Sequence, residues 1–176
     1  YLQKEDWNLC EKLLLYSLEI AEELHDLQNI CHDSRILGKI YAEKKSRNKQ
    51  EEYYKKALTV SEKLKDEAGQ CIDHRNLGEL CLSRGYKKRS EEHFKAALNI
   101  SLERADKKEI ATDYRHMGNL SFNNGDREQA EKCYLDALNL TLEIGDKNGT
   151  AQDYTYIGNL KFKGGMIDEA EVNFDK

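Results

Sequence analysis

The stretch Asp113-Tyr-Arg-His-Met-Gly-Asn-Leu120 has a related copy every 40 residues along the chain. The copies begin at Asp33, Asp73 and Asp153, and each has a glycine five residues after its aspartate. Two further sets of apolar or aromatic residues keep the same interval: Leu18, Leu58, Leu98 and Leu138, and Tyr54, Phe94, Tyr134 and Phe174. A period of this length is typical of stacked repeats, in which each unit buries its apolar face against its neighbours.

Residues 111–150 illustrate how one unit is expected to fold. Apolar side chains recur at three- to four-residue spacing as far as Phe122, which predicts a helix. The cluster 123–126 (Asn-Asn-Gly-Asp) then predicts a turn, and a second apolar stripe predicts a helix that continues to Ile144. Asp146 is predicted to cap the next helix. Each unit is therefore predicted to be a helical hairpin.

The repeat predicts an all-α solenoid of antiparallel helix hairpins, with about eight to nine helices, as one array over residues 1–176. We expect complete units at 31–70, 71–110 and 111–150, with partial units at 1–30 and 151–176. The chain opens at Tyr1, and neither end has the polar capping helix that such arrays need. The sequence is therefore expected to be a fragment of a longer protein.

The composition fits long helices with solvated outer faces. The 176 residues have a net charge of −5, 35% charged residues and no proline. No apolar run approaches the roughly 18–20 residues that span a bilayer. The five cysteines lack the spacing of a disulfide framework, and Cys10, Cys31 and Cys71 share repeat positions with small residues. We interpret these three as small core residues and expect a reducing, cytoplasmic location.

The residues 113–120, together with Gly125, Ala130, Tyr134 and Ala137, closely resemble the tetratricopeptide repeat. The units here are six residues longer and lack the proline that usually ends the second helix. In this respect they resemble the repeats of Pins-type spindle-orientation scaffolds and of bacterial peptide-responsive regulators, and are similar to those of kinesin light chains. The resemblance implies a right-handed superhelix whose concave groove binds proteins or peptides.

Motifs that carry catalytic chemistry are absent from the sequence: there is no phosphate-binding loop, dinucleotide fingerprint, nucleophile elbow or zincin helix. Cys71 and His74 are three residues apart on a predicted helix and could supply two metal ligands. A second pair with this spacing does not occur, so a core cysteine and a surface histidine are the preferred interpretation. We expect no enzymatic activity, no cofactor and no metal.

The repeated aspartates 33, 73, 113 and 153 allow two interpretations. They are predicted to have a structural role near the start of each first helix, where they suit the helix dipole or pair with a basic side chain of an adjacent helix. A ladder that faces a basic ligand is the less favoured interpretation. Two residues later come Arg35, Arg75 and Arg115, which either clamp ligand carboxylates or neutralise the aspartates.

The resemblance places the arginines and neighbouring repeat positions on the concave groove. The hypothetical peptide-binding residues are His32, Arg35, Lys39, Arg75, Glu79, Leu82, Arg115, Asn119, Phe122, Asn123, Asn159, Phe162 and Lys163. The expected partner is a protein or peptide with acidic residues or a free carboxylate, and neither nucleic acid nor membrane. A regulatory or sensor arm of a larger protein is the alternative, and an RNA-binding helical repeat is disfavoured by the acidic net charge.

Overall fold

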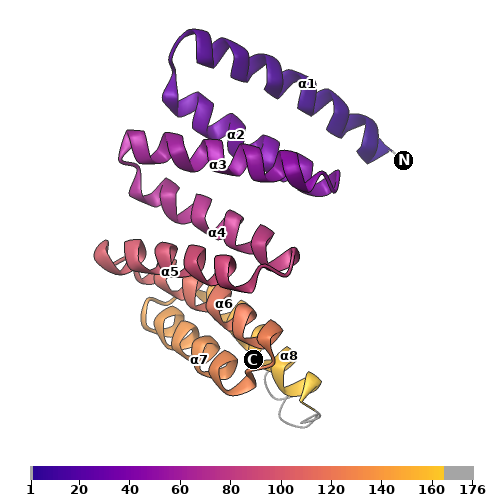
Figure 1. Cartoon of the computed structure of the whole chain (residues 1–176). Helices are drawn as coiled ribbons and strands as arrows, with labels where there is room; N and C mark the ends of the chain where they lie inside the picture. Colours follow the sequence, from indigo (N-terminus) through magenta and orange to yellow (C-terminus); the bar gives the residue numbers. More distant parts are fainter. Residues whose placement is uncertain (1, 165–176) are drawn as a thin grey trace. The chain divides into compact units, whose positions relative to one another are not determined.

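The computed structural model describes residues 2–164, and every element in that range is an α-helix (Figure 1). The helices are α1 (Leu2–Glu23), α2 (Leu27–Glu43), α3 (Arg47–Leu64), α4 (Glu67–Ser83), α5 (Lys87–Glu103), α6 (Lys107–Asn124), α7 (Arg127–Glu143) and α8 (Lys147–Lys163). The predicted all-α class is confirmed. Of the expected unit 151–176, the positions after Gly164, including Phe174, lie outside the described residues.

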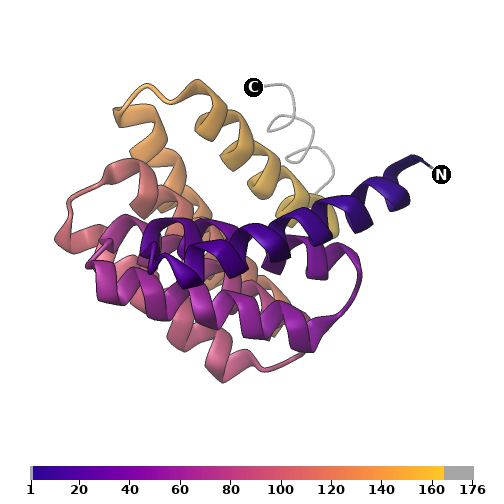
Figure 2. The same ribbon diagram turned by 90° about the horizontal axis from the view of Figure 1, so that it is seen from above.

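The chain forms two compact units, residues 1–80 and 81–176. In the first unit, α2 packs against both α1 and α3, as antiparallel neighbours joined by short turns (Figure 2). In the second, α6 packs against α5 and α7, and α7 packs against α8. The even-numbered helices from α2 onward begin at residues 27, 67, 107 and 147, which are 40 residues apart. No helix among the described residues has the length and apolarity to cross a membrane.

Aspartate side chains begin several helices by accepting hydrogen bonds from backbone N–H groups three residues later. The donor–acceptor pairs are Asn29–Asp26, Gly69–Asp66, Glu109–Asp106, Gln129–Asp126 and Gly149–Asp146, with distances of 3.0–3.2 Å. Such a side chain satisfies one of the N–H groups that the first helical turn leaves without a partner. The predicted capping role of Asp146 is confirmed, and Asp106 caps α6 in the same way.

The turns between helices use the left-handed backbone region. Gly125, at the predicted turn after α6, has φ of 85°. Equivalent turns at Gly85 and Gly145 also have positive φ, whereas the turn after α5 places Ala105 at φ of 51°. Because a side-chain Cβ is crowded in this region, glycine suits it better than alanine.

A glycine in the first helix of a hairpin lets a tyrosine of the second helix pack directly on the backbone. A Cβ built on Gly118 would lie 2.4 Å from Cε1 of Tyr134, and one on Gly38 would lie 2.3 Å from Cε1 of Tyr54. These distances are shorter than any van der Waals contact, so only hydrogen fits at either position. Gly118 thus lies where the two helices of its hairpin meet.

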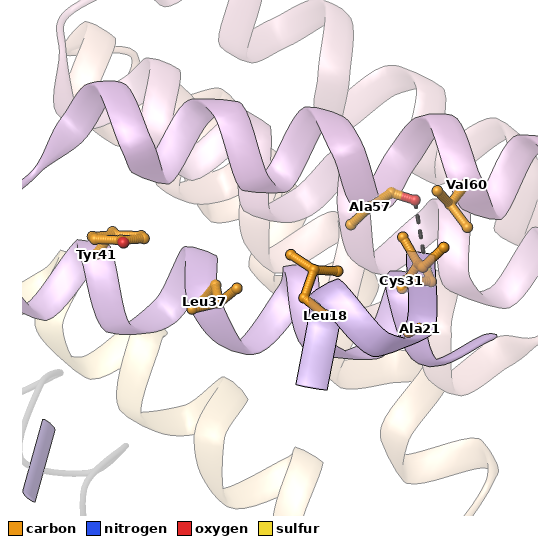
Figure 3. Close-up of a cluster of buried hydrophobic side chains, with 8 residues drawn as sticks. Leu18, Ala21, Cys31, Leu37, Tyr41, Ala57 and Val60 are labelled. Carbon is orange, nitrogen blue, oxygen red and sulfur yellow. Dashed lines mark hydrogen bonds between the residues drawn. The ribbon is translucent and has the colours of Figure 1, made fainter. Parts of the chain in front are cut away.

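The core of the first unit lies between α1, α2 and α3 (Figure 3). Its buried residues are Leu18, Ala21, Ile30, Cys31, Leu37, Tyr41, Ala57 and Val60. The thiol of Cys31 donates to the carbonyl of Ala57 at 3.5 Å, and burial raises its pKa. Cys31 and Cys71 are buried, as predicted, but Cys10 is exposed. The core prediction for Cys10 is wrong because no other described residue covers its side of α1.

Candidate functional site

The repeated arginines and aspartates form ion pairs within each compact unit. Arg35 on α2 donates two hydrogen bonds to Asp73 on α4, from Nε at 2.6 Å and from Nη2 at 2.8 Å. Arg115 on α6 makes the same pair with Asp153 on α8, at 2.5 and 3.1 Å. Both carboxylates are fully buried. Hydrogen bonding to Asp73 raises the pKa of Arg35, which keeps the guanidinium charged.

A hydroxyl group from the preceding helix completes the environment of three of the aspartates. Each accepts at Oδ2 from a hydroxyl twelve residues earlier in the chain: Ser61 to Asp73 at 2.9 Å, Ser101 to Asp113 at 2.6 Å and Thr141 to Asp153 at 2.8 Å. A buried carboxylate is tolerated when it is paired and hydrogen-bonded in this way. Pairing with adjacent helices therefore explains the aspartates better than the helix dipole does, since Asp153 lies in the second turn of α8.

These pairs decide between the two roles that the sequence left open for the arginines. The guanidinium groups of Arg35 and Arg115 are committed to buried carboxylates and do not present a free fork to a ligand. Arg75 is also buried, with 8% of its surface exposed. Of the two roles, the structure therefore shows the second for Arg35 and Arg115: each neutralises a buried aspartate of the same compact unit.

A pocket of about 370 Å³ lies between α6 and α8 of the second unit, with a tyrosine of α7 in its wall. Its lining residues are Asn119, Phe122, Asn123, Tyr134, Tyr156, Asn159, Leu160 and Lys163. Five of the thirteen groove residues named from the sequence thus come together here: Asn119, Phe122, Asn123, Asn159 and Lys163. This volume is within the usual range for ligand pockets.

Two tyrosines fix the polar geometry of this pocket. The hydroxyl of Tyr134 donates to Oδ1 of Asn119 at 2.7 Å, and the ring of Tyr134 stacks on Tyr156 with centroids 5.2 Å apart. Burial raises the pKa of Tyr134, so the phenol stays protonated and remains a donor at neutral pH. Because Oδ1 of Asn119 is engaged, its Nδ2 group is left to donate to another acceptor.

The rim of the pocket is cationic. Nζ of Lys163 lies 4.9 Å from the ring centroid of Phe122, in a cation–π contact. Asn123 Nδ2 donates to the backbone carbonyl of Asn119 at 2.8 Å, which holds the last turn of α6. Lys163 is the single charged residue among the described residues of the lining, which gives this part of the pocket a positive charge that favours anionic groups.

The other groove candidates lie elsewhere. His32, Lys39 and Glu79 are exposed in the first unit, and Leu82 is half-buried in the second. Phe162 is 60% exposed and is not among the lining residues of this pocket, so its place in a peptide-binding groove stays a prediction. It lies one residue before Lys163 on α8, which turns it about 100° away around the helix.

Sequence reasoning missed Tyr134, Tyr156 and Leu160 in the lining. Tyr134 belongs to a repeated aromatic position and therefore resembled pure core. Tyr156 stands at a repeat position that varies, with Ile36, Asn76 and His116 in the other copies. That variation was the signal that could have identified it as a surface of individual function.

The alternative metal site gains nothing from the geometry. Cys71 is buried and His74 half-buried on α4, and burial lowers the pKa of His74. No group of three or more histidine, cysteine or acidic side chains suited to a metal occurs among residues 7–164.

Comparisons with known proteins agree with the helical architecture. The tetratricopeptide repeat family model matches residues 36–64 and 114–143. Among solved structures, BtubC (BKLC) from P. vanneervenii aligns with a TM-score of 0.82 at 22% identity, over 98% of this chain and 72% of that one. A Rap protein in complex with competence and sporulation factor gives 0.82 at 16% identity, over 99% and 49%.

The STAND protein PH0952 from Pyrococcus horikoshii, which has a tetratricopeptide repeat sensor, gives a TM-score of 0.69 at 17% identity, over 94% of this chain and 30% of that chain. No curated protein matches the sequence significantly. At these identities the structural likeness shows the fold. The chain thus carries tetratricopeptide repeats, recognised at residues 36–64 and 114–143, in an all-helical array of the tetratricopeptide type.

Proposed function

We propose that this chain is a non-catalytic protein-interaction module that binds an extended, acidic peptide segment in the pocket between α6 and α8. The observation that carries the proposal is the engagement of Asn119 by Tyr134, which orients the amide so that Nδ2 is left to donate. Asn159 lines the same pocket and supplies a second amide. Two amides with donors and acceptors match the alternating C=O and N–H groups of a peptide backbone.

The chemistry of the lining also selects the side chains of the partner. Lys163 supports an interaction with an aspartate, a glutamate or a terminal carboxylate of the ligand. The ring of Phe122 and the stacked tyrosines offer an apolar wall beside it. An acidic residue next to an apolar one is therefore the sequence feature that we expect in the ligand.

Selection of peptides from a random library displayed on phage would test this function. Selected peptides are expected to contain the acidic–apolar pair, and to bind the Asn119→Ala and Asn159→Ala variants at least about tenfold more weakly, since each loses hydrogen bonds to the backbone. Lys163→Glu should abolish binding of peptides with an acidic residue. Asn99→Ala and Lys147→Glu are matched controls on exposed positions of α5 and α8 outside the pocket, and should bind normally.

Two results would contradict the proposal in different ways. If no peptide is enriched, peptide binding itself is wrong. If enriched peptides bind the Asn119→Ala/Asn159→Ala double variant as tightly as the wild type, the pocket is the wrong site.

A regulatory or sensor arm of a larger protein is the second candidate. It is supported by the likeness to PH0952, a protein with a tetratricopeptide repeat sensor, of which this chain spans 30%. In that role the same pocket would bind the signal, and the two functions share the peptide experiment.

A further inference from the structure

The outer face of α1 displays an apolar stripe without a cover among the described residues. Leu9, Leu13, Tyr16, Ile20 and Leu24 are all exposed, and their spacing of three or four residues places them on one side of the helix. Leu13 has 61% of its surface exposed and Leu24 has 72%. A continuous stripe of this kind usually marks an interaction surface.

The repeat shows what normally covers this stripe. Forty residues later, Tyr53, Val60 and Leu64 on α3 occupy the positions of Leu13, Ile20 and Leu24. Val60 belongs to the buried core of the first unit, and Tyr53 and Leu64 are partly buried against it. Tyr53 also stacks on Tyr41 of α2, with ring centroids 5.4 Å apart. The exposed stripe of α1 is therefore the counterpart of a face that, on α3, receives a helix of the α2 kind.

A buried carboxylate beside α1 independently indicates that a basic group can bind next to the stripe. Asp33 is 5% exposed, and its Oδ2 atom has no hydrogen-bond partner among the described residues. Its other oxygen, Oδ1, lies 3.2 Å from Nδ1 of His32. The hydroxyl that serves the other aspartates is missing because Ala21 stands where Ser61, Ser101 and Thr141 stand in the later copies.

The other aspartates also identify the group that Asp33 lacks. Asp73 and Asp153 each take a bidentate arginine from the helix that lies two helices earlier, Arg35 on α2 and Arg115 on α6. A helix packed on the stripe of α1 would likewise take the position two helices before α2, the helix that carries Asp33. An arginine of that helix would therefore reach Oδ2 of Asp33.

We propose that the exposed stripe of α1 and the carboxylate of Asp33 together form a docking site for an amphipathic α-helix that carries an arginine. The leucine side chains supply apolar burial, and the carboxylate selects the guanidinium fork. A second copy of this chain, stacked through α8, fits less well. Its residue at the arginine position is Thr155, which has no guanidinium.

The probe is a labelled peptide of residues 26–45, which contains α2 and Arg35, titrated with the whole chain by fluorescence anisotropy. We expect binding, and an Arg35→Leu peptide should bind at least about tenfold more weakly, because it leaves Asp33 unpaired. With the Asp33→Asn protein, the two peptides should differ by less than about threefold. Because Oδ2 has no partner to lose, Asp33→Asn should keep the fold, which circular dichroism checks.

The apolar half of the site is tested with Leu13→Glu/Leu24→Glu, a double change on exposed positions that leaves the core untouched. This variant should lose the peptide. Equal affinity of the two peptides for the wild type, unchanged binding to the double variant, or no binding at all would overturn the proposal. Self-association of the wild type that the double variant abolishes, seen by sedimentation, would also overturn it, since a second copy would then occupy the face.

Discussion

Nε of Arg115 lies 2.5 Å from Oδ1 of Asp153, although 38 residues separate the two in sequence. The pair joins α6 to α8 and passes over α7, which contributes the hydroxyl of Thr141 to the same carboxylate. Three consecutive helices of one unit are thus tied at a single fully buried group. In a repeat array most contacts join adjacent elements, so a link that spans three helices extends the cooperative unit.

Removal of one partner of this pair should be strongly destabilising. Arg115→Met leaves the carboxylate of Asp153 buried without a counter-charge, which costs about 3–5 kcal/mol. The double change Arg115→Met/Asp153→Leu removes the stranded charge and should cost clearly less than the single change. Urea denaturation followed by circular dichroism measures both. If the double variant were less stable than the single one, the attraction between Arg115 and Asp153 would exceed the free energy that removing both charges from water costs.

Gly118→Leu should destabilise the hairpin of α6 and α7 by about 1–3 kcal/mol, because even a Cβ atom collides with Tyr134. Lys88→Leu, at an exposed position near the start of α5, is the control and should change stability by no more than about 0.5 kcal/mol. Denaturant melts of both variants compare them directly. If the Gly118 variant is as stable as the parent, the contact between α6 and α7 is not the one described.

Ala105→Gly should stabilise the protein by about 0.5–1 kcal/mol. Ala105 has φ of 51°, and a side chain in the left-handed region carries a penalty that glycine avoids. The reverse change Gly125→Ala, at φ of 85°, should destabilise by a similar amount. Opposite shifts of the thermal midpoint for the two variants check the sign, and shifts in the same direction would contradict the backbone explanation.

The helices could be predicted because their signals are local. Asp106 and Asp146 as caps, the turn at Gly125 and the contact of Gly118 all follow from residue types within one 40-residue unit. The partner of each repeated aspartate could not be predicted in the same way. Arg115 and Asp153 come from different 40-residue repeats of the same compact unit. The paired N–H donors of an arginine can bind an internal carboxylate as well as a ligand.

Only part of the lining of the candidate pocket could be predicted from the sequence. The family resemblance placed Asn119, Asn159 and Lys163 on the groove, at repeat positions whose residues vary along the chain. Tyr134 was missed because it has two roles at once: its ring fills the space over Gly118, and its hydroxyl orients Asn119. A repeated aromatic residue indicates only the first of these roles.

A lower pH should weaken the packing of α1 against α2, because it protonates the carboxylate of Glu11. Hydrogen bonds from Lys44 and then from Tyr41 lower the pKa of Glu11 below its usual 4.5. A carboxylate whose pKa is lowered on folding stabilises the protein above its unfolded pKa, and this contribution is lost as the pH falls through the folded value. Glu11→Gln should therefore be less stable than the wild type at pH 7, and the difference in stability should shrink progressively as the pH falls below 4.5. A constant gap across this range would show that the charge of Glu11 is not responsible.

Ala21→Ser should stabilise the first unit, because it supplies the hydroxyl that Asp33 lacks. Ser61, at the same repeat position, donates to Asp73 at 2.9 Å, and Ala21 is buried like its counterparts. A hydrogen bond to a charged group contributes about 1.5–3 kcal/mol, and burial of the hydroxyl offsets part of this, so a net gain of about 1 kcal/mol is expected.

The control for this gain is Ala21→Ser in the Asp33→Leu background, where no carboxylate can accept the bond. There the serine should be neutral or destabilising, because its hydroxyl is buried without an acceptor. The same gain in both backgrounds, measured by urea denaturation, would show that the serine does not act through Asp33. Oδ2 of Asp33, which marks the docking site on α1, would then lie outside the reach of a hydroxyl at residue 21. The hydroxyl groups at the same repeat position on α3, α5 and α7 do reach their aspartates.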